Sequence, residues 1–287
     1  FTVPVFHRLA RFGIGKRFMS ATTSFDWQST PAAVWRRHRS GLRAIRRLDP
    51  VQWQDLKGID RQQQALARNT ERFLAGEPSN NALLWGSRGT GKSSLIKALL
   101  NRYQERGLRM IEVDKDDLVN LPEIVDDICE LPFRFVIFCD DLSFDVGESS
   151  YKALKSVLEG SLELPPENVR VYATSNRRHL LPEHNSDNLA AKQVDGEIHP
   201  GEAIEEKIAL SDRFGLWVSF YPFSQDHYLA VVQHWLGQLA REHGLQWQWS
   251  EALQLEAVRW ATGRGNRNGR CAYQFARSWV GRQLLEP

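Results

Sequence analysis

The chain has 287 residues, of which 42% are hydrophobic and 25% are charged. This length accommodates one α/β core and a smaller appended domain, and the composition excludes a disordered protein and a membrane-spanning one. No apolar run approaches the roughly 18 residues that a transmembrane helix needs. The three cysteines, Cys129, Cys139 and Cys271, are far apart and odd in number, which excludes a disulfide framework and predicts reduced thiols in a cytoplasmic protein.

The net charge of +2 is unevenly distributed along the chain. Residues 1–48 contain ten basic residues and one acid, Asp26, and we expect them to form a basic helical arm. Such an arm predicts an acidic partner. Nucleic acid is one candidate, because Trp35 beside Arg36 and Arg37 offers stacking next to charge. A protein, an acidic segment of the chain itself and a membrane surface are the alternatives.

From residue 49 onward the pattern alternates between helices and strands. We expect helices over residues 54–74, 92–106 and 149–160, and strands over residues 82–85, 108–113, 133–139, 169–174 and 216–220. The strand at 133–139 is almost continuously apolar, as expected for a strand that is buried on both faces. Strands that alternate with helices predict βαβ units and a mostly parallel sheet.

Two segments differ from this alternation. Residues 183–209 are polar and rich in Asp, Glu, Gly and Pro, and we interpret them as a long surface insertion. From residue 224 onward the pattern is helical, with candidate helices over 225–241, 251–261 and 269–285. The sequence therefore predicts three parts, which are the basic arm (1–48), an α/β domain (49–223, including the insertion) and a small C-terminal helical domain (224–287).

A glycine-rich loop follows the strand at 82–85. It fits the pattern G-x-x-x-x-G-K-[ST] completely, with an apolar strand before it and a helix after it. The glycines let backbone N–H groups approach phosphate oxygens, and the helix N-terminus adds partial positive charge. We expect Lys92 to reach the β- and γ-phosphates and Ser93 to offer its hydroxyl to Mg²⁺. The predicted ligands are therefore ATP and Mg²⁺, bound by Gly86, Ser87, Arg88, Gly89, Thr90, Gly91, Lys92, Ser93 and Ser94.

A second motif is an apolar strand that ends in two carboxylates, Asp140 and Asp141. In this Walker B pattern the first carboxylate holds the magnesium ion, usually through water, and the second positions or activates the attacking water. We therefore assign Asp140 to the metal and Asp141 to catalysis. Many ATPases have Glu at the second position, so the shorter Asp leaves the rate of hydrolysis open.

These motifs, in this order, resemble those of the AAA+ superfamily. Five runs are in addition similar to an uncharacterised bacterial AAA+ family, an ATP-binding domain of unknown function: NNALLWGSRGTGKSS (80–94), EVDKDDL (112–118), DDLSF (140–144), YATSNRRHLL (172–181) and LSDRFGLWVSFYPF (210–223). The resemblance implies an α/β P-loop NTPase fold with a helical lid at the C-terminal end. It also implies an ATPase that works as a homo-oligomer, such as a hexameric ring. The macromolecule on which this ATPase acts does not follow from the resemblance.

The resemblance assigns two further catalytic roles. Asn176 ends an apolar strand and corresponds to sensor 1, which aligns the attacking water, with Thr174 as the alternative. Arg213 lies in a Ser-Asp-Arg-Phe sequence that resembles the arginine-finger box. Such a finger enters the ATP site of a neighbouring subunit, and it contributes roughly 10³–10⁵ in rate in well-studied systems.

The resemblance also extends to the rest of the nucleotide site. Arg270, with Arg267 as the alternative, lies near the start of the last predicted helix, where AAA+ lids carry the sensor 2 arginine. Gly58 and Ile59 precede the P-loop and correspond to the segment that lines the adenine pocket. We expect all of these groups around one nucleotide.

Three activities fit these motifs. The first is an ATP-hydrolysing remodeller or loader of a macromolecular client, which we favour. The second is a slow, ATP-dependent switch or adaptor that binds nucleic acid or a protein, and the third is a P-loop phosphotransferase. Residues 114–119 lack the aromatic residue and the glycine that threading unfoldases place in the pore loop, which argues against processive threading of polypeptides.

Overall fold

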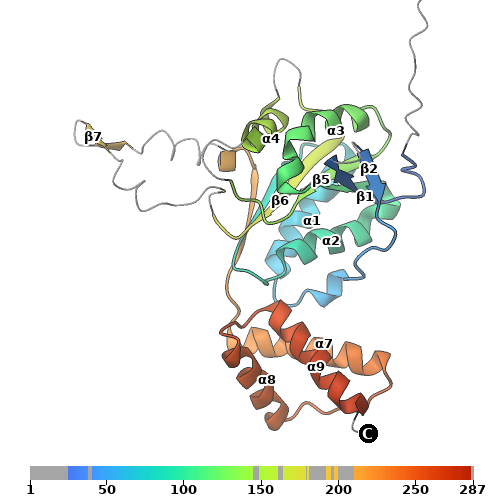
Figure 1. The fold of residues 1–287 in the computed structure, drawn as a ribbon, viewed down its shortest axis with the longest axis vertical. Helices are drawn as coiled ribbons and strands as arrows, with labels where there is room; N and C mark the ends of the chain where they lie inside the picture. Colours follow the sequence, from blue (N-terminus) through green and yellow to red (C-terminus); the bar gives the residue numbers. More distant parts are fainter. Residues whose placement is uncertain are drawn as a thin grey trace, which may run out of the picture.

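The computed structural model describes residues 25–37, 41–144, 149–160, 164–178, 180, 192–194, 197–199 and 210–285. An α/β body carries a sheet with helices on both faces, and a bundle of three helices lies beside it, at the bottom of Figure 1. Among the helices of the described part, none is long and apolar enough to cross a membrane.

The sheet of the α/β body has seven strands. Their spatial order is β2 (Gly41–Ala44), β1 (Ala32–Arg36), β4 (Leu108–Glu112), β5 (Arg134–Cys139), β6 (Val169–Ser175), β3 (Ala82–Gly86) and β9 (Leu216–Phe220). All neighbouring pairs are parallel except β1 and β2. The carboxyl ends of β3, β5 and β6 therefore lie side by side at one edge of the sheet, where ligands bind in open parallel sheets.

Helices cover both faces of this sheet because side chains alternate along each strand. Leu84 of β3 packs with apolar residues of α1 (Asp60–Ala75) and α2 (Lys92–Tyr103). The preceding Leu83 packs on the opposite face with residues of α3 (Leu121–Ile128) and α4 (Ser149–Glu159). Figure 1 shows α3 and α4 above the sheet and α1 and α2 below it. The strands are thus buried on both faces, as their apolar sequences predict.

Short elements complete the α/β body. They include the 3₁₀-helices η2 (Trp53–Asp55), η3 (Gln104–Arg106) and η4 (Lys115–Asn120). Strands β7 (Lys192–Val194) and β8 (Glu197–His199) pair antiparallel within the expected insertion. The other residues of that insertion lie outside the described residues.

The C-terminal bundle consists of α7 (Gln225–Glu242), α8 (Glu251–Gly263) and α9 (Gly269–Leu285). Ser224, Ser250 and Asn268 cap the N-termini of these helices with their side chains. Ser224 accepts from the N–H of His227, and Ser250 accepts from the N–H of Leu253. The three helices share a core of aliphatic and aromatic residues, including Tyr228, Leu236, Ala257 and Phe275.

The expectation of a helical arm is wrong for its described part. Residues 32–36 form β1 and residues 41–44 form β2, because the apolar sequence Ala-Ala-Val-Trp extends the sheet beside β4 and buries its side chains there. Trp35 is only 3% exposed, so it cannot stack on a nucleic-acid base.

The expected helix at 54–74 is also divided, since Gly58 has a φ of +72° and α1 begins after it. Residues 1–24 and 38–40 lie outside the described residues.

Candidate nucleotide site

The glycine-rich loop lies at the carboxyl end of β3 and leads into α2, which begins at Lys92. Its first glycine packs against the neighbouring strand β9. A Cβ atom on Gly86 would lie 2.0 Å from the carbonyl oxygen of Phe220, and the N–H of Ser87 donates to that oxygen at 3.0 Å. Only glycine fits this approach, so the start of the loop is held firmly by the sheet edge.

The Lys92 ammonium lies inside the loop. Its Nζ atom donates to the carbonyl oxygens of Gly86 and Ser87, both at 2.8 Å, and to Oδ1 of Asn176 at 3.1 Å. Burial lowers the pKa of Lys92 to about 8, and the nearby carboxylates of Asp141 and Asp140 oppose this shift only in part. The loop therefore holds its cation in a partly desolvated position, where negative charge would bind favourably.

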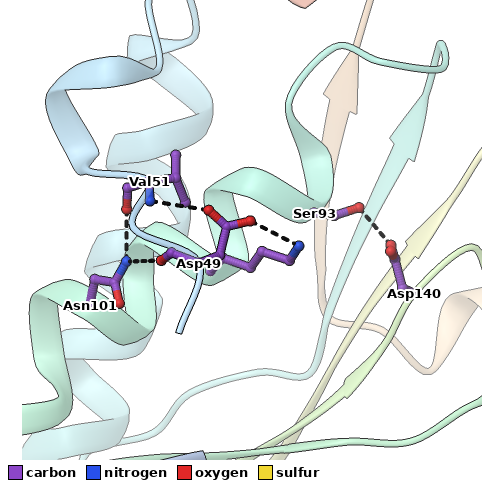
Figure 2. Close-up of polar contacts among 6 residues, drawn as sticks. Asp49, Val51, Ser93, Asn101 and Asp140 are labelled. Carbon is purple, nitrogen blue, oxygen red and sulfur yellow. Dashed lines mark hydrogen bonds and ion pairs between the residues drawn. The ribbon is translucent and has the colours of Figure 1, made fainter. Parts of the chain in front are cut away.

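Ser93 and Asp140 meet across the gap between α2 and the end of β5. Figure 2 shows the two side chains pointing toward each other, with 2.6 Å between Ser93 Oγ and Asp140 Oδ1. Thr174 of β6 donates its hydroxyl to the same carboxylate oxygen at 2.5 Å. Hydroxyl and carboxylate oxygens are hard ligands of the kind that Mg²⁺ prefers, so Ser93 and Asp140 fit a magnesium ion.

Within the described ranges, no group of three or more His, Cys, Asp or Glu side chains could hold a metal ion on its own.

Asp141 follows Asp140 in an unusual backbone conformation, with a φ of 50°. Its N–H donates to Thr174 Oγ1 at 2.9 Å, and its carboxylate accepts a hydrogen bond from Nδ2 of Asn176. Both alternatives for sensor 1 therefore contact the Walker B pair: Asn176 joins Asp141 to Lys92, and Thr174 joins Asp140 to the backbone of Asp141. The neighbouring strands β5 and β6 bring these groups together.

A cavity of about 1210 Å³ opens between the P-loop, residues 45–59 and the C-terminal helices. Of the predicted residues it is lined by Ile59, Arg88, Gly89, Thr90, Gly91, Lys92, Ser93, Ser94, Asp140, Asp141, Thr174, Asn176 and Arg270. A nucleotide in this cavity would touch both parts of the molecule.

The helical bundle contributes aromatic residues to the cavity that sequence motifs do not indicate. Trp235 of α7 and Tyr273 of α9 both line it, with their ring centroids 4.8 Å apart. Their apolar periodicity is typical of any packed helix, so no sequence signal distinguishes them.

Polar side chains of α2 bind the segment around Asp49 and Val51, which forms another wall of the cavity (Figure 2). Asn101 donates through Nδ2 to the carbonyl oxygens of Asp49 and Val51, both at 2.8 Å, and Lys97 Nζ donates to the Asp49 carboxylate at 3.2 Å. Glu112, at the end of β4, also lines the cavity, and burial raises the pKa of its carboxyl group.

The predicted residues Gly58, Gly86 and Ser87 do not line the cavity. Gly58 packs under the ring of His227 in α7, whose Nε2 atom lies 2.8 Å from the carbonyl oxygen of Lys57. Gly86 and Ser87 form the base of the loop and bind Lys92 through their carbonyl groups. Of the two residues predicted to line the adenine pocket, Ile59 therefore lines this cavity and Gly58 does not.

Of the arginines predicted outside the P-loop, Arg270 lines the cavity, whereas Arg213 and Arg267 do not. Arg213 lies outside the cavity, with a 16% exposed side chain that pairs with the carboxylate of Glu159 at the end of α4. Arg267 is exposed and also lies outside the cavity, in contrast to Arg270. In this structure the Arg213 side chain is directed to Glu159 and does not line the cavity of its own chain.

One contact between the α/β body and the helical bundle could not be predicted from the sequence. His234 Nε2 of α7 lies 3.0 Å from the carboxylate of Asp55 in η2, which is only 6% exposed. The same carboxylate accepts from the N–H of Gln52 at 2.8 Å. Because 179 residues separate His234 from Asp55, no local pattern could have predicted the pair.

Comparisons with known proteins identify the family and the fold of this chain. The family described as "Protein of unknown function (DUF815)" matches residues 28–283. No curated protein sequence matches the chain.

Two solved structures show the same fold. One is the RuvB Holliday junction branch migration motor of Thermotoga maritima, with a TM-score of 0.51 and 12% identity over 79% of this chain and 63% of that chain. The other is the Orc1 protein of Aeropyrum pernix in complex with DNA, with a TM-score of 0.52 and 15% identity over 75% of this chain and 57% of that chain. The chain thus spans less than two thirds of their length. Both are AAA+ ATPases, and at these identities the similarity establishes the AAA+ fold.

Proposed function

This chain belongs to the DUF815 family and has the AAA+ fold, and from this premise we propose that it binds Mg-ATP and hydrolyses it to ADP and phosphate. The observation that carries the proposal is one hydrogen-bonded network at the carboxyl ends of β3, β5 and β6. Lys92 contacts Asn176, which contacts Asp141, and Ser93 contacts Asp140. Thr174 connects these two pairs, because its hydroxyl binds both the Asp140 carboxylate and the N–H of Asp141.

Each member of the network has a role in this proposal. Lys92 leaves its carbonyl acceptors and binds the phosphates, whose negative charge compensates its desolvation. Ser93 and Asp140 hold Mg²⁺, which supplies neutralisation of the phosphate charge. Asp141 accepts a hydrogen bond from the attacking water and Asn176 keeps the Asp141 carboxylate in place. Arg270 reaches the phosphates from the lid.

We also propose that the site is completed between subunits of a homo-oligomer, such as a hexameric ring. Arg213 lies outside the cavity of its own chain, which supports an action on a neighbouring chain. In that arrangement it releases Glu159 and stabilises the transition state of the neighbour. The C-terminal residues 224–285 act as a lid, since Trp235, Arg270 and Tyr273 face the nucleotide cavity from this part.

Hydrolysis is coupled, in this proposal, to the remodelling or loading of a macromolecular client. The RuvB structure is described as a branch migration motor and the Orc1 structure contains DNA, which makes nucleic acid a partner to test. Stacking on Trp35 is excluded by its burial, but exposed arginines remain on β1, β2 and the segment after them: Arg36, Arg37, Arg43, Arg46 and Arg47. A slow ATP-dependent switch that binds through these arginines is the second candidate.

The test of the proposed function is phosphate release from ATP over a range of protein concentrations. We expect turnover that requires Mg²⁺ and rises more than linearly with protein concentration, because each site needs a neighbour. A Mg²⁺-independent or absent reaction at all concentrations would contradict hydrolysis by this network.

The partner is tested by binding to duplex DNA at 50 and 200 mM salt. An interface with six to ten phosphates would lose about 10³–10⁵ in affinity between these concentrations. Absent or salt-insensitive binding would exclude nucleic acid as the client and would favour a protein client.

A further inference from the structure

Helix α9 begins directly on the P-loop. The N–H of Gly269, the first residue of the helix, donates to the carbonyl oxygen of Gly89 at 2.9 Å. The side chain of Asn268 donates through Nδ2 to the carbonyl oxygen of Arg88 at 3.1 Å. Two consecutive carbonyl groups of the loop are therefore bound by two consecutive residues of the lid.

Asn268 uses both ends of its amide group. While Nδ2 binds the loop, Oδ1 accepts from the N–H of Cys271 at 2.9 Å and so caps the first turn of α9. A single side chain thus starts the helix that carries Arg270 and attaches this helix to the P-loop. The cap fixes the side-chain torsion that aims Nδ2 at Arg88.

Little space separates the P-loop from the start of α9. A Cβ atom on Gly89 would lie 2.7 Å from Cγ of Asn268, and one on Gly269 would lie 3.1 Å from the carbonyl oxygen of Gly89. Gly89 also has a φ of +74°, a conformation that favours glycine. The loop and the start of α9 therefore approach each other as closely as glycine allows, and the two hydrogen bonds oppose their separation.

This attachment determines where the amides of the loop point. A trans peptide group is planar, with its C=O and N–H on opposite sides. When the lid binds the carbonyl groups of Arg88 and Gly89, it directs the N–H groups of Gly89 and Thr90 away from α9. These N–H groups belong to the part of the loop that lines the cavity. Their alignment before a ligand arrives reduces the free-energy cost of ordering them.

We propose that Asn268 is a positioning residue, which aligns the Gly89 and Thr90 amides for the triphosphate and seats the lid helix on the P-loop. This inference rests on the proposed function, since it concerns the same nucleotide site. It predicts a residue that raises phosphate affinity without contacting the phosphates.

The decisive variant is Asn268→Ser. Serine caps helices about as well as asparagine, so α9 keeps its first turn. The shorter serine side chain has no amide nitrogen that could donate to the carbonyl oxygen of Arg88. Asn268→Ala removes both the cap and the attachment. Ser250→Ala is the matched control, because it removes the cap of α8 on a helix whose start lies outside the cavity.

Calorimetric titration with Mg-ATP and with inorganic tripolyphosphate, together with thermal unfolding, separates the effects. For Asn268→Ser we expect an unchanged unfolding temperature and an affinity about fivefold to tenfold lower for both ligands, the loss that one hydrogen bond would cause. Ser250→Ala should lower the unfolding temperature and leave both affinities unchanged.

Wild-type affinity of Asn268→Ser for tripolyphosphate would overturn the inference, and so would an equal loss of affinity in Ser250→Ala. In both cases the proposed function survives if the wild-type protein binds ATP and Lys92→Ala does not. Failure of the wild-type protein to bind ATP would overturn the proposed function and the inference together.

Discussion

Lys92 and Asn176 are separated by 84 residues in the chain, and Lys92 Nζ donates to Asn176 Oδ1 at 3.1 Å. Asn176 in turn donates from Nδ2 to the carboxylate of Asp141. One amide group thus connects the cation of the P-loop with the second Walker B carboxylate. A phosphate that binds Lys92 must compete with this amide, so nucleotide binding directly affects the residue assigned to water activation.

Replacement of Lys92 tests the phosphate-binding role. We expect Lys92→Ala to abolish tight ATP binding, because it removes the ammonium group that the loop holds. In the wild-type protein this group donates to three acceptors. The measurement is a calorimetric titration with Mg-ATP. Lys155→Ala is the matched control, since Lys155 is exposed on α4 and lies outside the cavity. Wild-type affinity of Lys92→Ala would show that the loop is not the phosphate site.

The lowered pKa of Lys92 predicts proton uptake when ATP binds. Burial holds this pKa at about 8 in the free protein, and phosphate charge raises it in the complex. ATP affinity should therefore be fully present below pH 8 and should fall as the pH rises through 8. Near pH 8, titrations in buffers with different ionisation enthalpies should show uptake of a fraction of a proton. Lys92→Arg, which keeps its charge, should show neither effect, and a pH-independent wild-type affinity between 7 and 9 would contradict the prediction.

Asp141→Asn should preserve ATP binding and stop hydrolysis, because the amide cannot accept the proton of the attacking water. The substitution is well suited to the backbone, since Asp141 has a φ of 50° and asparagine tolerates this left-handed region. Unfolding temperature and ATP affinity should thus remain near the wild-type values while phosphate release disappears. Normal phosphate release by this variant would assign the water-activating role to another residue.

Arg213→Ala should lose turnover by roughly 10³-fold or more and still bind ATP, as expected for a group that acts on a neighbouring subunit. Glu159→Gln distinguishes this role from a structural one, because it weakens the same ion pair but keeps the guanidinium group. If Glu159→Gln retains turnover and Arg213→Ala does not, the guanidinium itself is required. Unchanged phosphate release by Arg213→Ala would favour a site that is complete within one chain, as in a phosphotransferase.

Stability should depend strongly on the approach of Gly86 to β9. In Gly86→Ala the new Cβ atom would lie 2.0 Å from the Phe220 carbonyl oxygen, so we expect a loss of about 3 kcal/mol in the free energy of unfolding. Gly107→Ala is the control, because Gly107 has a φ of +88° but no atom within 4 Å of the added Cβ. It should lose only about 1–2 kcal/mol from backbone strain. Urea unfolding of both variants measures the difference, and equal losses would show that the contact with Phe220 relaxes freely.

The sequence by itself determined those features that depend on local chemistry. The P-loop residues from Arg88 to Ser94, the Walker B carboxylates and Asn176 were all identified from short motifs, and the structure places them around one cavity. The strand at 216–220 and the helix at 269–285 have the bounds that their apolar patterns predict. Local patterns suffice here because a strand or helix is specified by which of its faces is apolar.

Only the tertiary structure decided the features that join distant segments. Residues 32–36 form a strand because they pair with β4 and bury Trp35 there. Their apolar run is too short for the sequence alone to distinguish a strand from a helix. The pairs Asp55–His234 and Arg88–Asn268 connect residues that are 179 and 180 positions apart. Such contacts depend on how whole helices pack, which is decided by the sum of many buried apolar surfaces rather than by any one motif.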